Sequence, residues 1–184
     1  MKLSPEIIEE KVFTLLGCVY YGDPFHSAEP WSQDNEIGKT WERFGKLYFI
    51  NSRFLDKIIL NPKIGYEVHI ESRDYRKTKS FHIFVGMEVK NTEFVPIEMF
   101  IKILPRTKYA FFTTKGDDYN TCEYAFQEWL PKSKFEQSFP YIIEAYEEGR
   151  YDYQKIDDQE NEIDWYIPIK VKKQEKKSAN PDDK

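Results

Sequence analysis

The order of apolar and polar residues in the first half of the chain predicts a strand, a helix and two more strands. Residues 12–21 are rich in β-branched and aromatic side chains and end at Gly22-Asp-Pro, which indicates a strand followed by a loop over 23–34. Asp34 or Asn35 is a candidate N-cap for a helix over about 35–50, whose apolar face carries Ile37, Trp41, Phe44 and Tyr48. Residues 64–71 alternate apolar and polar side chains and 80–89 form an apolar run, so both are expected to be strands.

The second half of the chain repeats this order of elements. Strands are predicted over 99–104 and 109–114, separated by Pro105, which cannot donate a hydrogen bond to a ladder. Gly116-Asp-Asp indicates a turn and a helix start. The helix is expected to stop at Pro131 and to carry the apolar residues Tyr119, Cys122, Phe126 and Trp129. Residues 141–146 and 163–171 complete this half as strands.

The repeated order predicts an α+β fold of two pseudo-repeated β-α-β-β lobes with antiparallel sheets. One domain is expected over 1–171, with lobe one at about 6–92 and lobe two at about 96–171. Residues 172–184 are charged and offer no apolar anchor, which predicts a disordered tail.

Length and composition favour one medium domain and argue against nucleic-acid and membrane partners. The 184 residues are 40% apolar, enough for a hydrophobic core, and the 17% aromatic share leaves rings that could line a cavity. The net charge is −5 with scattered Lys and Arg, whereas direct nucleic-acid binding needs clustered cations. Without a signal core or an apolar run of transmembrane length, a soluble, cytoplasmic protein with no membrane partner is expected. Cys18 and Cys122 are expected to be reduced, buried thiols.

Motifs for metal, cofactor or nucleophilic chemistry are weak. Of the three histidines, His69 and His82 fall on neighbouring predicted strands. Glu67, His69 and Glu71 share one strand face, and the preferred interpretation is that this polar face is exposed to solvent. No metal site and no cofactor are therefore expected, since a metal needs three or four convergent ligands. The sequence has no Ser-His-Asp order, phosphate-cradling glycine loop or CxxC pair.

Four stretches in the second half carry a family resemblance: Lys108-Tyr-Ala-Phe-Phe-Thr-Thr-Lys-Gly, Glu128-Trp-Leu-Pro-Lys-Ser, Pro140-Tyr-Ile-Ile-Glu-Ala-Tyr and Glu162-Ile-Asp-Trp-Tyr-Ile-Pro-Ile-Lys. In this order they resemble the GyrI-like effector-binding family, which occurs alone and fused to AraC-type and MerR-type DNA-binding regions. The first half matches through Trp41-Glu-Arg-Phe, Gly65 and Val85-Gly-Met-Glu-Val, so the resemblance spans about 6–171. No helix-turn-helix accompanies it, which suggests a stand-alone form.

The sequence also departs from the family pattern. Ile143 stands where relatives usually have Phe, and one extra residue separates Pro140 from Glu144. Ile83 stands where a pocket Tyr often lies, and the segment 146–162 is longer and more acidic than usual. These changes affect the expected ligand more than the expected fold.

The resemblance singles out Glu144, which would otherwise pass for an exposed strand carboxylate. In relatives the matching Glu lies at the floor of an aromatic cleft between the lobes and pairs with cationic, lipophilic ligands. A carboxylate removed from water gains from a bound cation, and aromatic faces add cation–π attraction. Tyr146 shares a strand face with Glu144.

Other cleft residues are expected on several elements. On the closing strand either Tyr166 or Trp165 should face the cleft, and the resemblance favours Tyr166. Trp41 and Phe44 either pack in the core or line the cleft, and Tyr109 and Phe111 are further candidates. Trp129 is expected to be a structural anchor at the helix end.

The resemblance implies a small-molecule-binding protein, similar to the multidrug-binding domains of transcription regulators, that holds a lipophilic or cationic aromatic compound. One alternative is a hydrolase of cyclopropane-bearing or other electrophilic toxins, with Glu144 as the catalytic acid or base. Another is a protein-interaction role, as in relatives that inhibit DNA gyrase. A separate protein partner, the ligand's identity and the choice between binding and hydrolysis stay open at the level of sequence.

Overall fold

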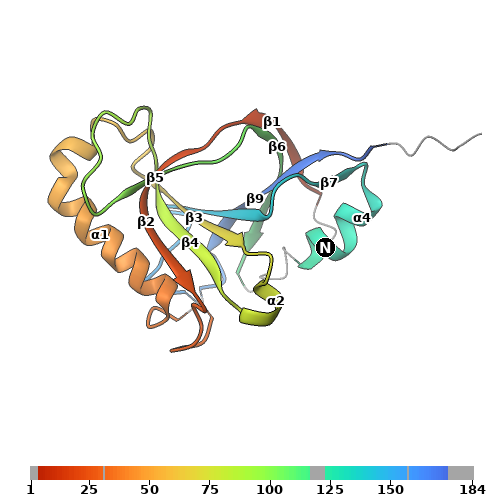
Figure 1. The fold of residues 1–184 in the computed structure, drawn as a ribbon, viewed down its shortest axis with the longest axis horizontal. Helices are drawn as coiled ribbons and strands as arrows, with labels where there is room; N and C mark the ends of the chain where they lie inside the picture. Colours follow the sequence, from red (N-terminus) through yellow and green to blue (C-terminus); the bar gives the residue numbers. More distant parts are fainter. Residues whose placement is uncertain (1–3, 31, 117–122, 157, 174–184) are drawn as a thin grey trace, which may run out of the picture.

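One antiparallel sheet carries the fold in the computed structural model, which describes residues 4–30, 32–116, 123–156 and 158–173 (Figure 1). Within these residues the strand order is β1 (Glu6–Lys11), β6 (Thr107–Lys115), β9 (Glu162–Val171), β8 (Tyr141–Glu147), β3 (Ile64–Glu71), β4 (Phe81–Glu88), β2 (Thr14–Gly22) and β5 (Phe100–Ile103). A short strand, β7 (Phe135–Gln137), also pairs with β9. β3 and β8 therefore occupy the middle of the sheet.

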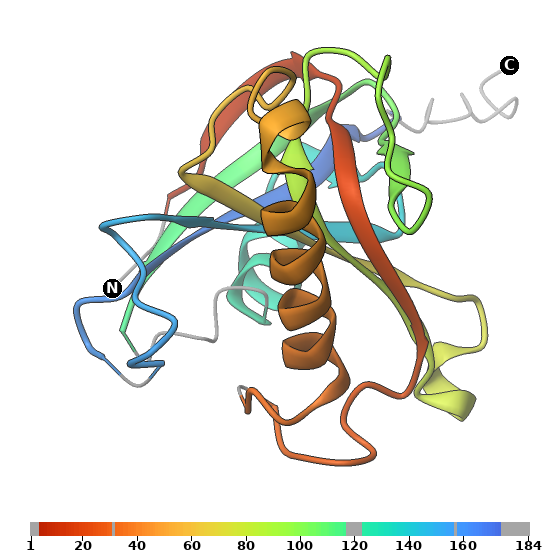
Figure 2. The ribbon, with the colours of Figure 1, turned by 90° about the vertical axis from the view of Figure 1, so that its left-hand side faces the viewer.

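Helices cover one face of this sheet, called here the helical face. The long helix α1 (Glu36–Leu55) packs on β2 and β4 and crosses the sheet in front of them (Figure 2). A π-helical segment, η1 (Tyr124–Trp129), runs into α4 (Leu130–Lys132) and packs with residues of β6 and β9. A single-turn helix, α2 (Tyr75–Thr78), links β3 to β4. The helical face of β3 and β8 thus lies between α1 and η1–α4.

Sequence explains where α1 begins. The side chain of Asn35 accepts hydrogen bonds from the backbone N–H groups of Ile37 and Gly38, which satisfies two donors that a helix start leaves free. Phe44 and Leu55 are buried against the sheet. The helix therefore runs past the expected end near residue 50, because Leu55 still contributes to the core.

The opposite face of the sheet encloses a second core. Phe13, between β1 and β2, makes edge contacts with Tyr66, Tyr109 and Tyr166, at ring-centroid distances of 5.5, 5.4 and 5.3 Å. These partners lie on β3, β6 and β9, and the same cluster includes Ile8 of β1 and Leu15 of β2. The sheet therefore curls (Figure 1), which brings residues from near both of its ends into one cluster. Aromatic edge-to-face contacts of this kind favour a tightly packed interior.

Most predicted elements are confirmed, and the differences have local causes. The strand expected over 12–21 is β2, which begins at Thr14 after the buried Phe13, and β1 before it was not predicted. The second helix continues through Pro131 to Lys132, since proline is tolerated in the first turn of a helical segment. Tyr119 and Cys122, expected on this helix, lie outside the described residues, whereas Cys18 is a buried free thiol as expected.

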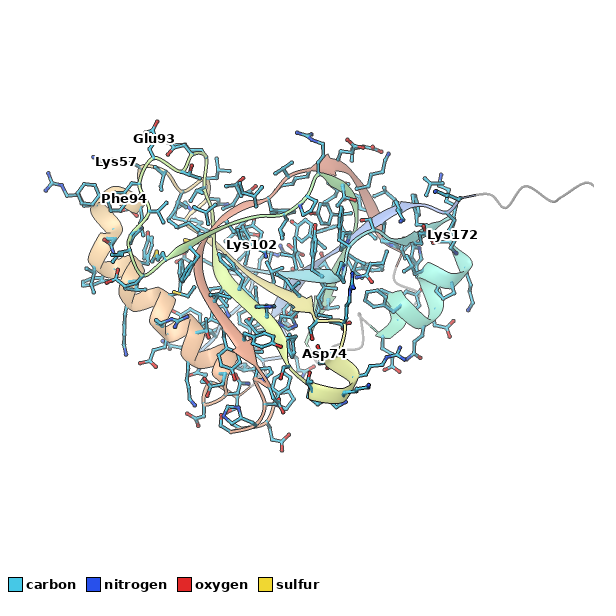
Figure 3. The ribbon with its side chains drawn as sticks, in the orientation of Figure 1. Lys57, Asp74, Glu93, Phe94, Lys102 and Lys172 are labelled. Carbon is cyan, nitrogen blue, oxygen red and sulfur yellow. The ribbon has the colours of Figure 1, made fainter. Side chains whose placement is uncertain are left out.

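The α+β class and the antiparallel pairing are as expected, but the sheet is continuous. β3 pairs with β8 from Ile64–Glu147 to Ile70–Tyr141, so the two halves share one sheet rather than carrying one each. Lys172, placed by sequence in a disordered tail, donates through Nζ to the carbonyls of Leu130, Pro131 and Ser133 and lies beside α4 (Figure 3). Residues 174–184 lie outside the described residues. Among the described helices, none has the length and apolarity required to cross a membrane.

Candidate functional site

Two glutamates meet on the helical face in the middle of the sheet. Glu67 of β3 and Glu144 of β8 are directly paired across the strands, and their residues are only 4% and 3% exposed. Like charges directly opposite each other on a sheet destabilise it, and burying a carboxylate costs free energy unless it is paired or hydrogen-bonded. The pair is therefore a costly arrangement that needs specific compensation.

Three side chains supply that compensation. The indole Nε1–H of Trp41 donates to Glu67 Oε2 at 2.6 Å, and the hydroxyl of Tyr146 donates to Glu144 Oε2 at 2.6 Å. Nε2 of His69 lies 2.5 Å from Glu67 Oε1 and 3.7 Å from Glu144 Oε1. Each carboxylate thus has one oxygen held by an aromatic side chain and the other turned toward the same imidazole.

Aromatic rings close over the two carboxylates. Trp41 meets Tyr146 edge-on at 5.9 Å between ring centroids, and Tyr146 meets Tyr151 at 4.8 Å. Trp41 can lie against β3 because residue 65 is glycine: a Cβ there would lie 2.8 Å from Cη2 of the indole.

A hollow of about 340 Å³ lies elsewhere, at the β5 edge, and is lined by Val19, Ile70, His82, Phe84, Phe100, Ile101 and Lys102. Glu144 does not line this hollow, and the near-complete burial of Glu67 and Glu144 shows that the candidate site is closed.

Burial and mutual proximity shift the pKa values in the site. Burial raises the pKa of Glu144 to about 7, with Glu67 adding to the rise, while His69 and the Tyr146 hydrogen bond act against it. Burial alone would lower the pKa of His69, but Glu144 and Glu67 together raise it to about 9. A carboxyl group with a pKa near 7 can hold a cation when ionised, and it can also exchange a proton, as the hydrolase alternative requires.

The structure brings some of the predicted site residues together. Glu144, Tyr146 and Trp41 form one contact network, and Phe44 packs against Trp41 at 6.1 Å from within the core beneath α1. Trp165 is the cross-strand partner of Glu144, so it shares the helical face, and its Nε1–H donates to Thr114 Oγ1.

Three predicted residues lie on the opposite face of the sheet from Glu144. Tyr166 pairs with Ile143, whose side chain points away from Glu144, so the β8–β9 register places Trp165 and not the preferred Tyr166 on the face of Glu144. Phe111 pairs with Tyr166 and shares its face. Tyr109 is fully buried in the second core, where its hydroxyl lies 2.8 Å from that of Tyr141. These three side chains do not contact the candidate site.

Two members of the site were not predicted from sequence. Glu67 and His69 were interpreted as exposed alternation, but Glu67 is buried and the side chain of His69 is only 20% exposed. The period-two pattern correctly placed them on one face, and the helices α1 and η1–α4 flank that face instead of leaving it to solvent. Glu71, the third residue of the pattern, is exposed as expected.

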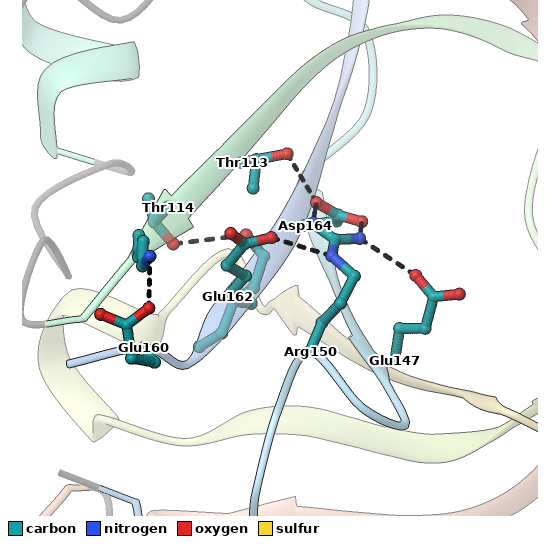
Figure 4. Close-up of polar contacts among 9 residues, drawn as sticks. Thr113, Thr114, Glu147, Arg150, Glu160, Glu162 and Asp164 are labelled. Atoms are coloured by element: carbon teal, nitrogen blue, oxygen red, sulfur yellow. Dashed lines mark hydrogen bonds and ion pairs between the residues drawn. The ribbon is translucent and has the colours of Figure 1, made fainter. Parts of the chain in front are cut away.

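A separate polar cluster anchors the chain between β8 and β9 (Figure 4). Arg150 Nη1 lies 2.7 Å from Asp164 Oδ2 and 3.1 Å from Glu147 Oε2, and its Nε lies 2.9 Å from Glu162 Oε2. The hydroxyl of Thr113 donates to Asp164 at 2.6 Å. Asp164 pairs with Ala145 across the strands, whereas Glu144 pairs with Trp165. The Asp164 side chain therefore lies on the opposite face of the sheet from Glu144.

Comparisons with known proteins fit this arrangement. A family model described as Cass2, integron-associated effector binding protein, matches residues 6–169. No curated protein matches the sequence. Similar solved structures include an integron cassette protein from the mobile metagenome of Vibrio cholerae, with 16% identity and a TM-score of 0.52, covering 92% of this chain and 100% of that one.

Two further structures share the fold at a TM-score of 0.59 each. SAV2435 bound to tetraphenylphosphonium is 14% identical and covers 92% of this chain and 94% of its own. The C-terminal domain of EcmrR is 11% identical and covers 93% of this chain and 99% of its own. At these identities the likeness establishes the α+β fold alone and not a ligand.

Proposed function

The chain belongs to the Cass2 family of integron-associated effector-binding proteins, and on that premise we propose that it binds a lipophilic cation against Glu144 and Glu67. The observation that carries the proposal is the pair of adjacent buried carboxylates flanked by Trp41 and Tyr146. The ligand lies on the helical face over β3 and β8, in a cleft between two pseudo-repeated β-α-β-β halves. α1 borders it on one side and η1–α4 on the other.

Charge supports a cationic ligand. Two carboxylates face a single imidazole, so the site has more negative groups than positive ones in a region that excludes water. A buried negative charge without a full partner is costly, and a bound cation relieves that cost. The solved relative SAV2435 holds tetraphenylphosphonium, a cation without hydrogen-bond donors that suits a site whose carboxylate oxygens already accept bonds from Trp41 and Tyr146.

Shape requires the site to open. With Glu144 only 3% exposed, a ligand reaches the carboxylate when Trp41 or Tyr146 moves aside. Each ring would then present its face to the cation, and each such contact contributes roughly 0.5–2 kcal/mol. Trp165, on the same face, is a further candidate contact, whereas Tyr166, Tyr109 and Phe111 are not part of the proposal.

Calorimetric titration of the protein with tetraphenylphosphonium tests the proposal. Glu144→Gln keeps the size of the side chain but removes its charge, so affinity should fall at least about tenfold, equivalent to about 1.4 kcal/mol. Glu71→Gln is the matched control, because Glu71 lies on the same strand and face as Glu67 but is exposed. It should bind like the wild type.

Neutral triphenylphosphine oxide separates charge from shape and should bind the wild-type protein far more weakly than the phosphonium. Equal affinity of Glu144→Gln and wild type for tetraphenylphosphonium would remove Glu144 from the binding site. Equal affinity of the wild type for the neutral and charged compounds would contradict the cation requirement itself.

A further inference from the structure

The atoms around His69 form an arrangement that binding of a lipophilic cation does not require. Nε2 of His69, one oxygen of Glu67 and one oxygen of Glu144 all lie within 4.8 Å of one another. Nε2 is 2.5 Å from Glu67 Oε1 and 3.7 Å from Glu144 Oε1. The three potential metal-ligating atoms come from two neighbouring strands in the middle of the sheet, where the backbone is held by ladder hydrogen bonds on both sides.

Neighbouring side chains fix how these ligating atoms point. Trp41 and Tyr146 each donate to an Oε2 atom, at 2.6 Å in both cases, which leaves both Oε1 atoms directed at His69. The His69 ring also packs against Phe81, with ring centroids 5.4 Å apart. Hydrogen bonds to ligating carboxylates and packing of ligating rings are what orient the ligands of protein metal sites.

We propose that Glu67, His69 and Glu144 bind a divalent transition-metal ion, with zinc as the test case. Zinc–nitrogen and zinc–oxygen bonds of about 2.0–2.2 Å place neighbouring ligand atoms about 3–3.5 Å apart in a tetrahedral site. The two separations from Nε2, 2.5 and 3.7 Å, bracket that range, and the separation of the two glutamate oxygens is within 4.8 Å, so small side-chain shifts bring all three atoms to ligand spacing.

Charge and ligand type select the class of metal. A metal ion at Nε2 takes the place of the proton there, and two carboxylates with the resulting neutral imidazole balance a dication charge for charge. With that proton in place the same three groups balance a singly charged cation. A mixed set of one nitrogen and two oxygens suits zinc, manganese, iron, cobalt or nickel. Calcium and magnesium prefer oxygen ligands alone. The proposal stands whether or not the same face also takes a lipophilic cation, and the two occupants exclude each other because both use Glu144.

Calorimetric titration of the untagged, chelator-stripped protein with zinc chloride tests the site. The wild type should bind one equivalent, and His69→Gln should weaken binding at least tenfold. His82→Gln is the matched control, because His82 lies on the neighbouring strand β4 but is exposed. Absence of zinc binding by the wild type, or an equal loss in the His82 and His69 variants, overturns the proposal.

A second measurement needs no variant and so does not depend on the folding of His69→Gln. The chain has three histidines, and a substoichiometric amount of paramagnetic cobalt or manganese should broaden the imidazole proton resonances of His69 selectively. Broadening confined to His26 or His82 contradicts the proposal. If tetraphenylphosphonium binds while neither metal experiment succeeds, the metal site is refuted and the proposed function is untouched.

Discussion

Trp41 and Gly65 show how a missing side chain shapes the candidate site. The indole lies against the strand at Gly65, and a Cβ added there would approach its Cη2 and Cζ3 atoms to 2.8 and 3.1 Å. In this position the indole N–H reaches Glu67 and the ring edge meets Tyr146. The one glycine thereby lets α1 contribute an aromatic wall and a hydrogen bond to the middle of the sheet.

We expect Gly65→Ala to lower the free energy of unfolding by about 1–3 kcal/mol, because the added methyl group displaces the Trp41 ring from a packed position. Gly45→Ala is the matched control. Gly45 lies in α1 with nothing within 4 Å of an added Cβ, so alanine should raise the stability by roughly 0.5–1 kcal/mol through helix propensity. Denaturant unfolding measures both, and a Gly65→Ala protein with wild-type stability and tryptophan emission would show that the contact is unimportant.

Sequence predicted part of the candidate site at this scale. Glu144, Tyr146 and Trp41 were expected and lie together. Glu67 and His69 were missed because alternation shows which residues share a face but not what covers that face. The choice between Trp165 and Tyr166 depends on which residue pairs with Glu144, and alternation within β8 and β9 does not show how the segment between the two strands sets their register.

At the scale of elements, the segment joining β8 to β9 depends on Arg150. Its guanidinium binds Asp164 through two nitrogens and also reaches Glu147 and Glu162, so one cation serves three acids on both flanking strands. Charge-assisted bonds of this forked kind are stronger than ordinary surface pairs.

Arg150→Ala should destabilise the protein by about 1–3 kcal/mol, since Asp164 is left with little exposure and without its main partner. Arg150→Lys should restore only part of this loss, because an ammonium group cannot form the fork. Lys155→Ala, in the same segment, removes an exposed ion pair in which Lys155 Nζ lies 3.7 Å from Asp152 Oδ2. This change should alter the stability by less than about 0.5 kcal/mol. Thermal and urea unfolding of the three variants test this order, and an Arg150→Ala protein as stable as Lys155→Ala would contradict it.

Elements with a long periodic pattern were predicted from sequence, and short ones were not. α1 and β3 follow patterns long enough to stand out, and β3 spans 64–71 as expected. β7 has three residues and β1 is six residues with four charged side chains, so neither shows a strand pattern on its own. Both form because a neighbouring strand, β9 or β6, offers hydrogen-bonding groups along its edge.

At the scale of the whole molecule, the continuous sheet joins the two halves of the chain. β3 and β8 pair along most of their length, and the core on the opposite face takes residues from both halves. Sequence alone predicted two lobes with separate sheets, because a repeated order of elements carries no information on whether the repeats pair with each other. The cores on the helical face lie almost wholly within one half each, so the β3–β8 pairing and the shared core on the opposite face are what join the halves.

We therefore expect a single cooperative unfolding transition. Tryptophan fluorescence and far-ultraviolet circular dichroism should give the same denaturant midpoint, and calorimetric and van't Hoff enthalpies should agree. Two lobes with independent cores would instead give two transitions or probe-dependent midpoints, and that result would show that the β3–β8 pairing contributes little.

The buried position of Glu144 also has a kinetic consequence. Any ligand that touches this carboxylate must wait for Trp41 or Tyr146 to swing away, so the observed association rate should level off at the opening rate as ligand concentration rises. Closure also reduces the apparent affinity by the fraction of open molecules: with about one molecule in a hundred open, the apparent Kd rises about a hundredfold. A substitution that frees the Trp41 ring would thus lower the free energy of unfolding and, at the same time, raise both the association rate and the apparent affinity for the ligand.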